Sequence, residues 1–200
     1  NKTVSFEGIG LHSGKLSKVK LLPGLEDQGI VFKRIDLKQN NIIKANYKNV
    51  SSAKLCTTLE NKNGVKVSTV EHLLSAFAGL GIDNAIVELD GPEVPIMDGS
   101  ARPFVFMIQS AGIQEQNDTK KFIKIKKTIE VRQDEKWAKI EPFDGFKVAF
   151  TIDFNHPAFN ESSQSSEIDF SSVSYLSQVS RARTFGFAKD IELLRKNNLA

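Results

Sequence analysis

The stretch 68–72 (STVEH) contains two side chains of types that often act in catalysis. A glutamate can accept a proton from water as a general base, and a histidine can bind a metal ion. Ser68 and Glu71 also have the S-x-x-E spacing of a capping box, in which the glutamate only satisfies the backbone at a helix start. Ala76 stands where the helix of a zinc protease would carry its second histidine. The spacing leaves both roles of Glu71 open, and a metal bound by His72 would need further ligands from elsewhere in the fold.

A second histidine, His12, lies in the glycine-punctuated loop 8–14 (GIGLHSG), between two predicted strands. The loop does not match the dinucleotide-binding fingerprint, which requires a helix after the glycines. Its three glycines predict a close approach of the backbone to other atoms or a positive φ. A histidine in such a loop is more often a surface residue than a ligand.

Two later segments hold further candidate residues. Asp98 lies in residues 92–100 (PEVPIMDGS), at a predicted strand-to-helix junction. An aspartate before a glycine is by default a turn residue, but such junctions also present functional carboxylates. Residues 181–187 (RARTFGF) place two arginines and Thr184 among aromatic residues. A β-strand explains the alternation of this segment and an anionic-ligand site explains its arginines, and the spacing favours neither.

Short strands and two helices are predicted to position these residues in the first half of the chain. Runs rich in Val, Ile and Phe, broken by Gly, Pro and Asn, predict strands, and Asn63-Gly64 predicts a hairpin turn. The apolar spacing after Thr69 predicts a helix that Gly79 and Gly81 close, and a second helix should run from Ser100 as N-cap to Gly112. The predicted strands are residues 2–6, 17–22, 29–34, 41–45, 54–60, 65–67 and 84–90.

The most polar stretch, residues 112–121 (GIQEQNDTKK), separates this region from a second series of elements. Strands followed by helices in each half predict two α+β domains: residues 1–115, a linker at 116–121, and residues 122–200. The chain ends at a helix with nothing to cover it, so we expect the second domain to be incomplete. The later elements are strands at 122–125, 129–133, 136–141 and 146–152, the last two joined through Asp144-Gly145, a polar loop at 161–167, and helices at 171–178 and 190–197.

The composition excludes several classes of protein. The chain has 200 residues, of which 40% are hydrophobic and 26% charged, as in ordinary soluble globular proteins. Its net charge of +3 is small for a nucleic-acid-binding protein, so no nucleic-acid partner is expected. No apolar run approaches the roughly 20 residues of a membrane span, no secretory signal opens the chain, and the single cysteine, Cys56, fits the cytoplasm. Residues 120–127 (KKFIKIKK) permit transient contact with a membrane surface, although a strand with a lysine-rich solvent face explains them better.

Four segments of the sequence carry a resemblance to one family. They are FEGIGLHSGK (6–15), STVEHLLSAFAGLGIDNAIVELDGPEVPIMDGSARPFVF (68–106), TIDFNHPAF (151–159) and SRARTFGFAKDIELLRKNNLA (180–200). Together they resemble the zinc-dependent UDP-3-O-acyl-N-acetylglucosamine deacetylases. The resemblance implies two similar domains, each a layered sandwich of β-sheets and α-helices, with the active site between them. It also implies a cytoplasmic, Zn²⁺-dependent amidohydrolase of a Gram-negative bacterium. Such an enzyme hydrolyses the acetamide of UDP-3-O-acyl-N-acetylglucosamine to UDP-3-O-acyl-glucosamine and acetate, the committed step of lipid A biosynthesis.

The same resemblance implies roles for individual residues. Glu71 resembles the general base that activates a zinc-bound water, His72 one of three zinc ligands, and Thr184 the hydroxyl that stabilises the oxyanion. Asp98 matches a position that lines the catalytic site, and residues 190–197 match the start of the wall of the acyl-chain passage. The positions that match substrate contacts are His12, Leu55, Cys56, Thr57, Phe154, Phe185, Phe187 and Asp190.

The family's remaining zinc ligands have no counterpart in these 200 residues. His12 and His156 do not match the ligand positions, so two further ligands are expected beyond Ala200. The chain alone is therefore expected to be inactive. The alternative is a catalytically incomplete module that binds a sugar nucleotide and an acyl chain. Glu71 has no evident use in binding alone, which favours the deacetylase.

Overall fold

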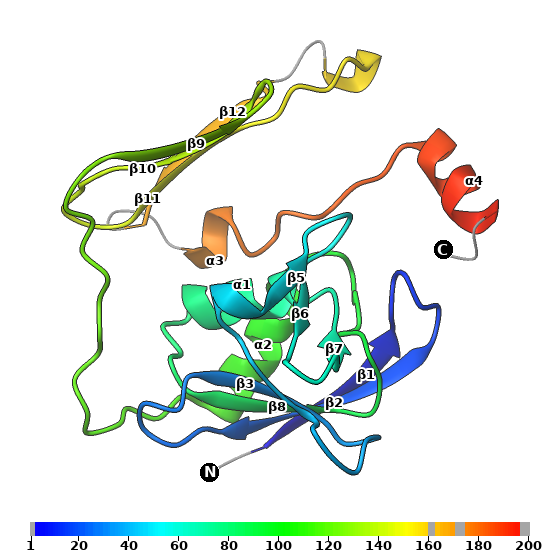
Figure 1. Ribbon diagram of the computed structural model, residues 1–200, viewed down its shortest axis with the longest axis vertical. Helices are drawn as coiled ribbons and strands as arrows, with labels where there is room; N and C mark the ends of the chain where they lie inside the picture. Colours follow the sequence, from blue (N-terminus) through cyan, green and yellow to red (C-terminus); the bar gives the residue numbers. More distant parts are fainter. Residues whose placement is uncertain (1–2, 160–162, 171–174, 197–200) are drawn as a thin grey trace. The chain divides into compact units, whose positions relative to one another are not determined.

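A computed structural model of the chain describes residues 3–159, 163–170 and 175–196, except the side chains of 189, 190, 193 and 194 (Figure 1). The chain forms two compact units, residues 1–119 together with 178–200, and residues 120–177. Helices and strands occur in both units, so the fold is of the mixed α+β class. The two-domain division with a linker at 116–121 stays a prediction.

The first unit is built on a five-stranded sheet in the described part of the chain. In order across the sheet, its strands are β1 (Val4–Ile9), β2 (Leu16–Pro23), β8 (Ala85–Leu89), β3 (Ile30–Arg34) and β4 (Ile42–Lys44). Neighbouring strands are antiparallel except β3 and β8, which are parallel. In β2, Val19 and Leu21 are buried while Lys20 between them is exposed. This alternation gives the sheet one apolar face and one polar face.

Two helices, α1 (Glu71–Gly79) and α2 (Arg102–Ala111), lie over one face of this sheet (Figure 1). The sequence predicted both, α1 from its apolar spacing and α2 from Ser100 as a cap and Gly112 as the stop. In α1, Leu73 and Phe77 are buried. In α2, Phe104 is fully buried, and its ring centroid lies 5.5 Å from that of Phe6 in β1. The core of the first unit is therefore the layer between the helices and the apolar face of the sheet.

The start of α2 differs slightly from the prediction. Ala101, not Ser100, is the N-cap residue of α2, but the Ser100 hydroxyl still accepts a hydrogen bond from the Arg102 N–H at 3.2 Å.

The C-terminal end of α1 is close to the prediction. There the Gly81 N–H donates to the Ala78 carbonyl, and Gly81 has a φ of 72°. A left-handed glycine after the last turn is a common helix stop, as the sequence indicated.

A smaller three-stranded sheet precedes α1 in the sequence. It consists of β5 (Val50–Ser52), β6 (Thr58–Glu60) and β7 (Lys66–Val67), and the short 3₁₀ helix η1 (Tyr47–Asn49) precedes it. Strands β6 and β7 form the hairpin expected from Asn63-Gly64, and Gly64 has a φ of 79°. Arg34 of the large sheet donates to the Lys66 carbonyl at 2.9 Å and is paired with Asp36. This buried arginine fixes the small sheet to the large one.

The second unit consists of two separate strand pairs in its described residues. These are β9 (Ile129–Gln133) with β10 (Lys136–Ile140), and β11 (Lys147–Thr151) with β12 (Ser165–Asp169). The helical segments are η2 (Pro157–Phe159) and α3 (Tyr175–Gln178). Every residue of β11 is exposed, including Val148 at 39% and Phe150 at 67%. Two-stranded sheets have too little surface to bury an apolar face by themselves.

Two expectations for the second unit are wrong. Residues 122–125 form no strand, because none of the segments that the structure describes pairs with their backbone, and Phe122 and Ile123 are 81% and 93% exposed. Of the loop expected at 161–167, residues 165–167 belong to β12, which pairs with β11, and residues 161 and 162 lie outside the described part. Strands β10 and β11, which are joined through Asp144-Gly145 as expected, each pair with a different strand.

The last helix in the described residues is α4 (Ala188–Lys196), close to the predicted range 190–197, of which residue 197 lies outside the described part. The helix predicted at 171–178 corresponds to α3, and residues 171–174 lie outside the described part. None of the helices in the described residues combines the length and apolar character that crossing a bilayer requires.

Two phenylalanines of α2 test the position of the core. Phe104 is fully buried and Phe106 is 70% exposed. We expect Phe104→Ala to lower the free energy of unfolding by about 3–5 kcal/mol, because it removes buried apolar surface and leaves a cavity. The matched Phe106→Ala should change it by about 0.5 kcal/mol or less. Urea unfolding of both variants measures this, and equal losses would show that the core lies elsewhere.

Candidate active site

Glu71 and His72 are the first two residues of α1, and both are half-buried. The capping box is not formed, because the N-cap residue is Val70 and no side chain caps the helix. Glu71 Oε2 instead accepts a hydrogen bond from the Thr57 N–H at 3.0 Å, and the Thr57 carbonyl accepts from the Val70 N–H at 3.4 Å. The glutamate carboxylate therefore faces the loop before β6, not the start of its own helix.

That loop contains the three neighbouring residues predicted to contact substrate. Leu55 has a φ of 69° and is 67% exposed. The Cys56 sulfur lies 3.8 Å from the Thr58 hydroxyl, and the Thr58 hydroxyl lies 3.0 Å from that of Ser68. The structure thus places the segment 55–57 against the start of α1. Both the segment and Glu71 were predicted from the sequence as parts of the site.

The glycines around His12 serve the two purposes that the sequence indicated. A Cβ on Gly8 would lie 3.0 Å from Cβ of Pro95, and one on Gly10 would collide with Glu93 Oε2 and Ser13 Oγ. Gly14 has a φ of +63°. The loop therefore packs closely on residues 93–95, and the Ile96 N–H also donates to the Ile9 carbonyl at 3.1 Å.

The buried carboxylate of Glu93 joins the His12 loop to the residues before α1. Its Oε1 accepts hydrogen bonds from the His12 N–H at 3.0 Å and from the Thr69 hydroxyl at 2.8 Å, and its Oε2 accepts from the Ser13 N–H at 2.8 Å. Burial raises the pKa of Glu93, but these hydrogen bonds together lower it by more, so the net pKa lies below its ordinary value. Sequence reasoning missed this residue. The sequence offered one indication of it, because Glu93 is an acidic residue within the otherwise apolar run Pro92–Pro95.

Asp98 and Thr184, which are distant in sequence, meet at one turn. The Thr184 N–H donates to the Gly99 carbonyl at 2.9 Å. Asp98 Oδ1 accepts from the Ser100 N–H at 3.0 Å and from its hydroxyl at 2.7 Å. Partial loss of water raises the pKa of Asp98, but the bonds from Ser100 and the positive charge of Arg183 lower it to a net value below its ordinary range. Residues 182–187 form no strand, so the strand interpretation of this segment is wrong.

The three predicted phenylalanines, Phe154, Phe185 and Phe187, each contact another aromatic ring. The Phe185 and Phe187 rings meet edge to face with centroids 5.8 Å apart. Phe154, in the second unit, stacks on Phe159 at 5.5 Å. Asp190 lies in α4, and its side chain is outside the described part of the chain.

No group of three or more His, Cys, Asp or Glu residues in the described part is arranged to hold a metal ion. His72 is a half-buried imidazole that can supply one ligand, but a catalytic zinc site requires three protein ligands. The described residues of this chain therefore do not by themselves fit a zinc site.

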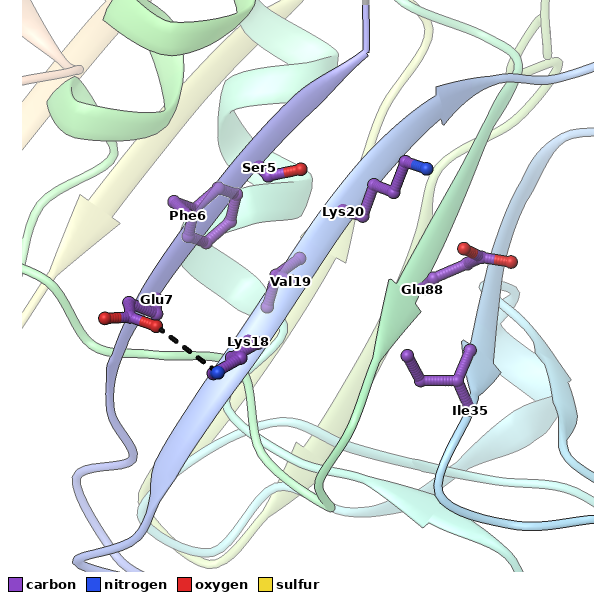
Figure 2. Close-up of a pocket in the computed structure, with 8 residues that line it drawn as sticks. All are labelled: Ser5, Phe6, Glu7, Lys18, Val19, Lys20, Ile35 and Glu88. Atoms are coloured by element: carbon purple, nitrogen blue, oxygen red, sulfur yellow. Dashed lines mark ion pairs between the residues drawn. The ribbon is translucent and has the colours of Figure 1, made fainter.

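An open depression on the first unit lies on the polar face of the large sheet (Figure 2). Its charges alternate in sign, and Glu7 and Lys18 approach within 4.0 Å. None of the predicted site residues lines it, so we do not assign the candidate site there. The lining residues are Ser5, Phe6, Glu7, Lys18, Val19, Lys20, Ile35 and Glu88.

The hydrogen bonds on Asp98 make a prediction about its titration. Because the folded-state pKa is lowered, Asp98 stabilises the fold above its ordinary value of 3.8, and this contribution is lost as the pH falls through the lowered pKa. Ser100→Ala removes the hydroxyl donor, so we expect the Asp98 pKa to rise toward its ordinary value. Carboxyl-detected NMR titration measures it, and an unchanged titration in Ser100→Ala would contradict this account.

Comparison with known proteins assigns the chain to a family. Residues 1–200 match the family described as LpxC, UDP-3-O-acyl N-acetylglycosamine deacetylase. Proteins named UDP-3-O-acyl-N-acetylglucosamine deacetylase are 59% identical over 198 residues in Thioalkalivibrio sulfidiphilus and 61% identical over 193 residues in Nitrosococcus oceani. These alignments cover 99% and 96% of this chain, but only 65% and 63% of the two relatives, so the chain spans about two thirds of their length. The chain belongs to the UDP-3-O-acyl N-acetylglycosamine deacetylase family.

Proposed function

We propose that the whole protein hydrolyses the acetamide of UDP-3-O-acyl-N-acetylglucosamine, giving UDP-3-O-acyl-glucosamine and acetate in the cytoplasmic synthesis of lipid A. The observation that carries this proposal is the 59% identity over 198 residues to a relative of that name. Amide hydrolysis joins a water oxygen to the carbonyl carbon and breaks the C–N bond. It requires a group that accepts a proton from the water and a group that protonates the leaving amine. The proton donor, like the remaining zinc ligands, is expected beyond Ala200.

Glu71 is the proposed proton acceptor. Its carboxylate is not used in a capping box, and its Oε2 is oriented by the Thr57 N–H. The free oxygen of a carboxylate held in this way can accept a proton without a change of side-chain conformation. Its neighbour His72, on the same first turn of α1, is the proposed zinc ligand.

The polar groups of Thr184 and His12 are the proposed contacts to the reacting part of the substrate. Within the described part of the chain, the Thr184 hydroxyl has no hydrogen-bond partner, which supports its assignment as the donor to the oxyanion. His12 Nε2 is buried and has no partner among the described residues. An unsatisfied buried nitrogen supports a direct contact with a ligand. Asp98, fixed by Ser100 beside the Thr184 backbone, is proposed to line the same site.

Apolar side chains are proposed to bind the acyl-glucosamine part of the substrate. Leu55 is 67% exposed and Phe185 is 54% exposed, so both present apolar surface to a ligand. Burial of an acyl chain contributes about 0.8 kcal/mol per methylene. The full proposed set of substrate contacts is His12, Leu55, Cys56, Thr57, Phe154, Phe185, Phe187 and Asp190.

Zinc dependence is part of the proposal. A bound zinc ion acts as a Lewis acid and polarises a carbonyl oxygen. His72 would be one ligand, and two further ligands are expected beyond Ala200, in the part of the relatives that this chain does not match.

The first test compares two polypeptides in one deacetylation assay. The natural full-length protein should release acetate from the acylated UDP-sugar, and removal of its metal by a chelator should abolish turnover, with zinc restoring it. The chain 1–200 alone should bind zinc weakly and be inactive, because one histidine cannot form a three-ligand site. Activity that persists at zinc contents below stoichiometry would overturn the metal assignment. Substrate binding without turnover in the full-length protein would favour a binding module.

The second test concerns Glu71. Glu71→Gln keeps an oxygen acceptor for the Thr57 N–H but removes the base, and Glu71→Ala removes both. Both variants should lower kcat by about 10²–10⁴ with little change in KM, which is the usual contribution of a general base.

Glu7, which lies on the polar face of the sheet, provides the control. Glu7→Gln should keep the natural kcat. If Glu71 had only a structural role, Glu71→Ala would lower the free energy of unfolding by about 1 kcal/mol and leave turnover nearly normal. Measuring Tm and kcat on the same preparations separates the two roles.

A further inference from the structure

Glu93 is a charged residue in an unusual place. The residue is 3% exposed, and among the residues that the structure describes no basic side chain forms an ion pair with it. A buried carboxylate without a counter-ion is costly unless hydrogen bonds satisfy it. The donors from His12, Ser13 and Thr69 meet that requirement, and they come from two segments that the candidate active site uses.

The first of these segments is the turn before α1. Thr69 is buried and has a φ of 57°, a left-handed conformation that a β-branched residue adopts only under strain. The Ser68 N–H donates to the Pro92 carbonyl at 2.8 Å, and the Val94 N–H donates to the Ser68 carbonyl at 3.0 Å. Residues 92–94 therefore hold the turn on both sides of Glu93, and its carboxylate holds the Thr69 side chain. Two residues after Thr69 the chain reaches Glu71.

The second segment is the His12 loop. One oxygen, Oε1 of Glu93, accepts from both the His12 N–H and the Thr69 hydroxyl. The absence of a Cβ at Gly10 is what lets the carboxylate approach the loop so closely. The loop and the turn thus share an acceptor atom, so neither can shift without disturbing the other.

We propose that Glu93 is a positioning residue for the active site: its carboxylate holds the strained Thr69 turn and the His12 loop in one arrangement, and thereby sets where Glu71, His72 and His12 stand relative to one another. This inference rests on the proposed deacetylase function for its kinetic consequence, while its structural consequence can be measured separately. The carboxylate acts through hydrogen bonds to these segments and does not contact the reacting atoms.

Four substitutions in the natural full-length protein test the proposal. Glu93→Gln keeps the size of the side chain but turns an NH₂ group toward N–H donors. Thr69→Val keeps the β-branched shape and removes only the hydroxyl, whereas Thr69→Ser keeps the hydroxyl. Glu88→Gln is the matched control, because Glu88 lies on the polar face of the sheet and pairs with Lys33 at 2.8 Å.

We expect kcat to fall about 10–100-fold in Glu93→Gln and Thr69→Val with KM nearly unchanged, because small displacements of catalytic groups have effects of this size. Thr69→Ser and Glu88→Gln should remain within about twofold of the natural kcat. In histidine ¹⁵N NMR spectra, the signals of His12 and His72 should shift in Glu93→Gln and Thr69→Val, while His156 in the second unit should not move.

Each result supports or overturns the proposal. A lower Tm with the natural kcat per folded molecule and unmoved histidine signals would make Glu93 a purely structural residue and overturn it. If Glu93→Gln does not fold, the pair Thr69→Val and Thr69→Ser decides by the same readouts. If the natural protein has no deacetylase activity, the proposed function fails, and the histidine signals still decide whether Glu93 positions these residues.

Discussion

The oxygens of a buried carboxylate must accept hydrogen bonds from protein donors. In this protein the buried carboxylate of Glu93 meets this requirement with donors from the segments around the candidate site. Two of the donors to Glu93, Ser13 and His12, lie 80 and 81 residues before it in the sequence, and the third, Thr69, lies 24 residues before it. No local sequence preference connects such distant segments. A single ionised side chain therefore determines how a loop, a turn and a helix start meet, and it does so through hydrogen bonds, because the described residues offer it no ion pair. Its lowered pKa means that these bonds more than offset the cost of burial.

The rest of the first unit provides a rigid support for this arrangement. The large sheet and its two helices bury a continuous apolar layer, with Phe32, Leu73 and Phe104 fully enclosed. Close packing of this kind fixes where α1 begins, and so fixes the backbone of Glu71 and His72. The loops that carry His12, Leu55 and Asp98 then attach to the core through backbone hydrogen bonds and tight glycine contacts. The candidate site thus consists of loops placed by a core, an arrangement common in enzymes.

The second unit has a different physical character. Its strand pairs expose apolar residues such as Val131, Trp137 and Phe150, each more than half exposed. Isolated hairpins of this kind are only marginally stable in water. The chain aligns with about two thirds of the length of its relatives, which agrees with the expectation of an incomplete second domain.

The sequence by itself determined the features that depend on neighbouring residues. Helical spacing predicted α1, and a cap residue and a closing glycine predicted α2. An apolar run between turn residues predicted β2, and Asn63-Gly64 predicted a hairpin. Each of these signals is carried by a few adjacent residues. The motifs also sufficed to indicate the family. Pairing between distant segments was decided only in the tertiary structure. The strand β12 forms in a polar stretch because β11 pairs with it. Residues 122–125 have a strand-like composition but pair with no strand among the residues that the structure describes.

The same division holds for the candidate site. The residue types at positions 71 and 72 indicated chemistry, but the two roles of Glu71 could not be separated from its spacing to Ser68. The tertiary structure excluded the capping box, because the Glu71 carboxylate accepts a hydrogen bond from the Thr57 N–H, from a loop 14 residues earlier in the chain. It also placed the Thr184 backbone on Gly99 and three donors around Glu93. The physical reason is that a hydrogen bond needs two partners in space, and sequence patterns describe the partner only when it lies within the same turn, helix or strand.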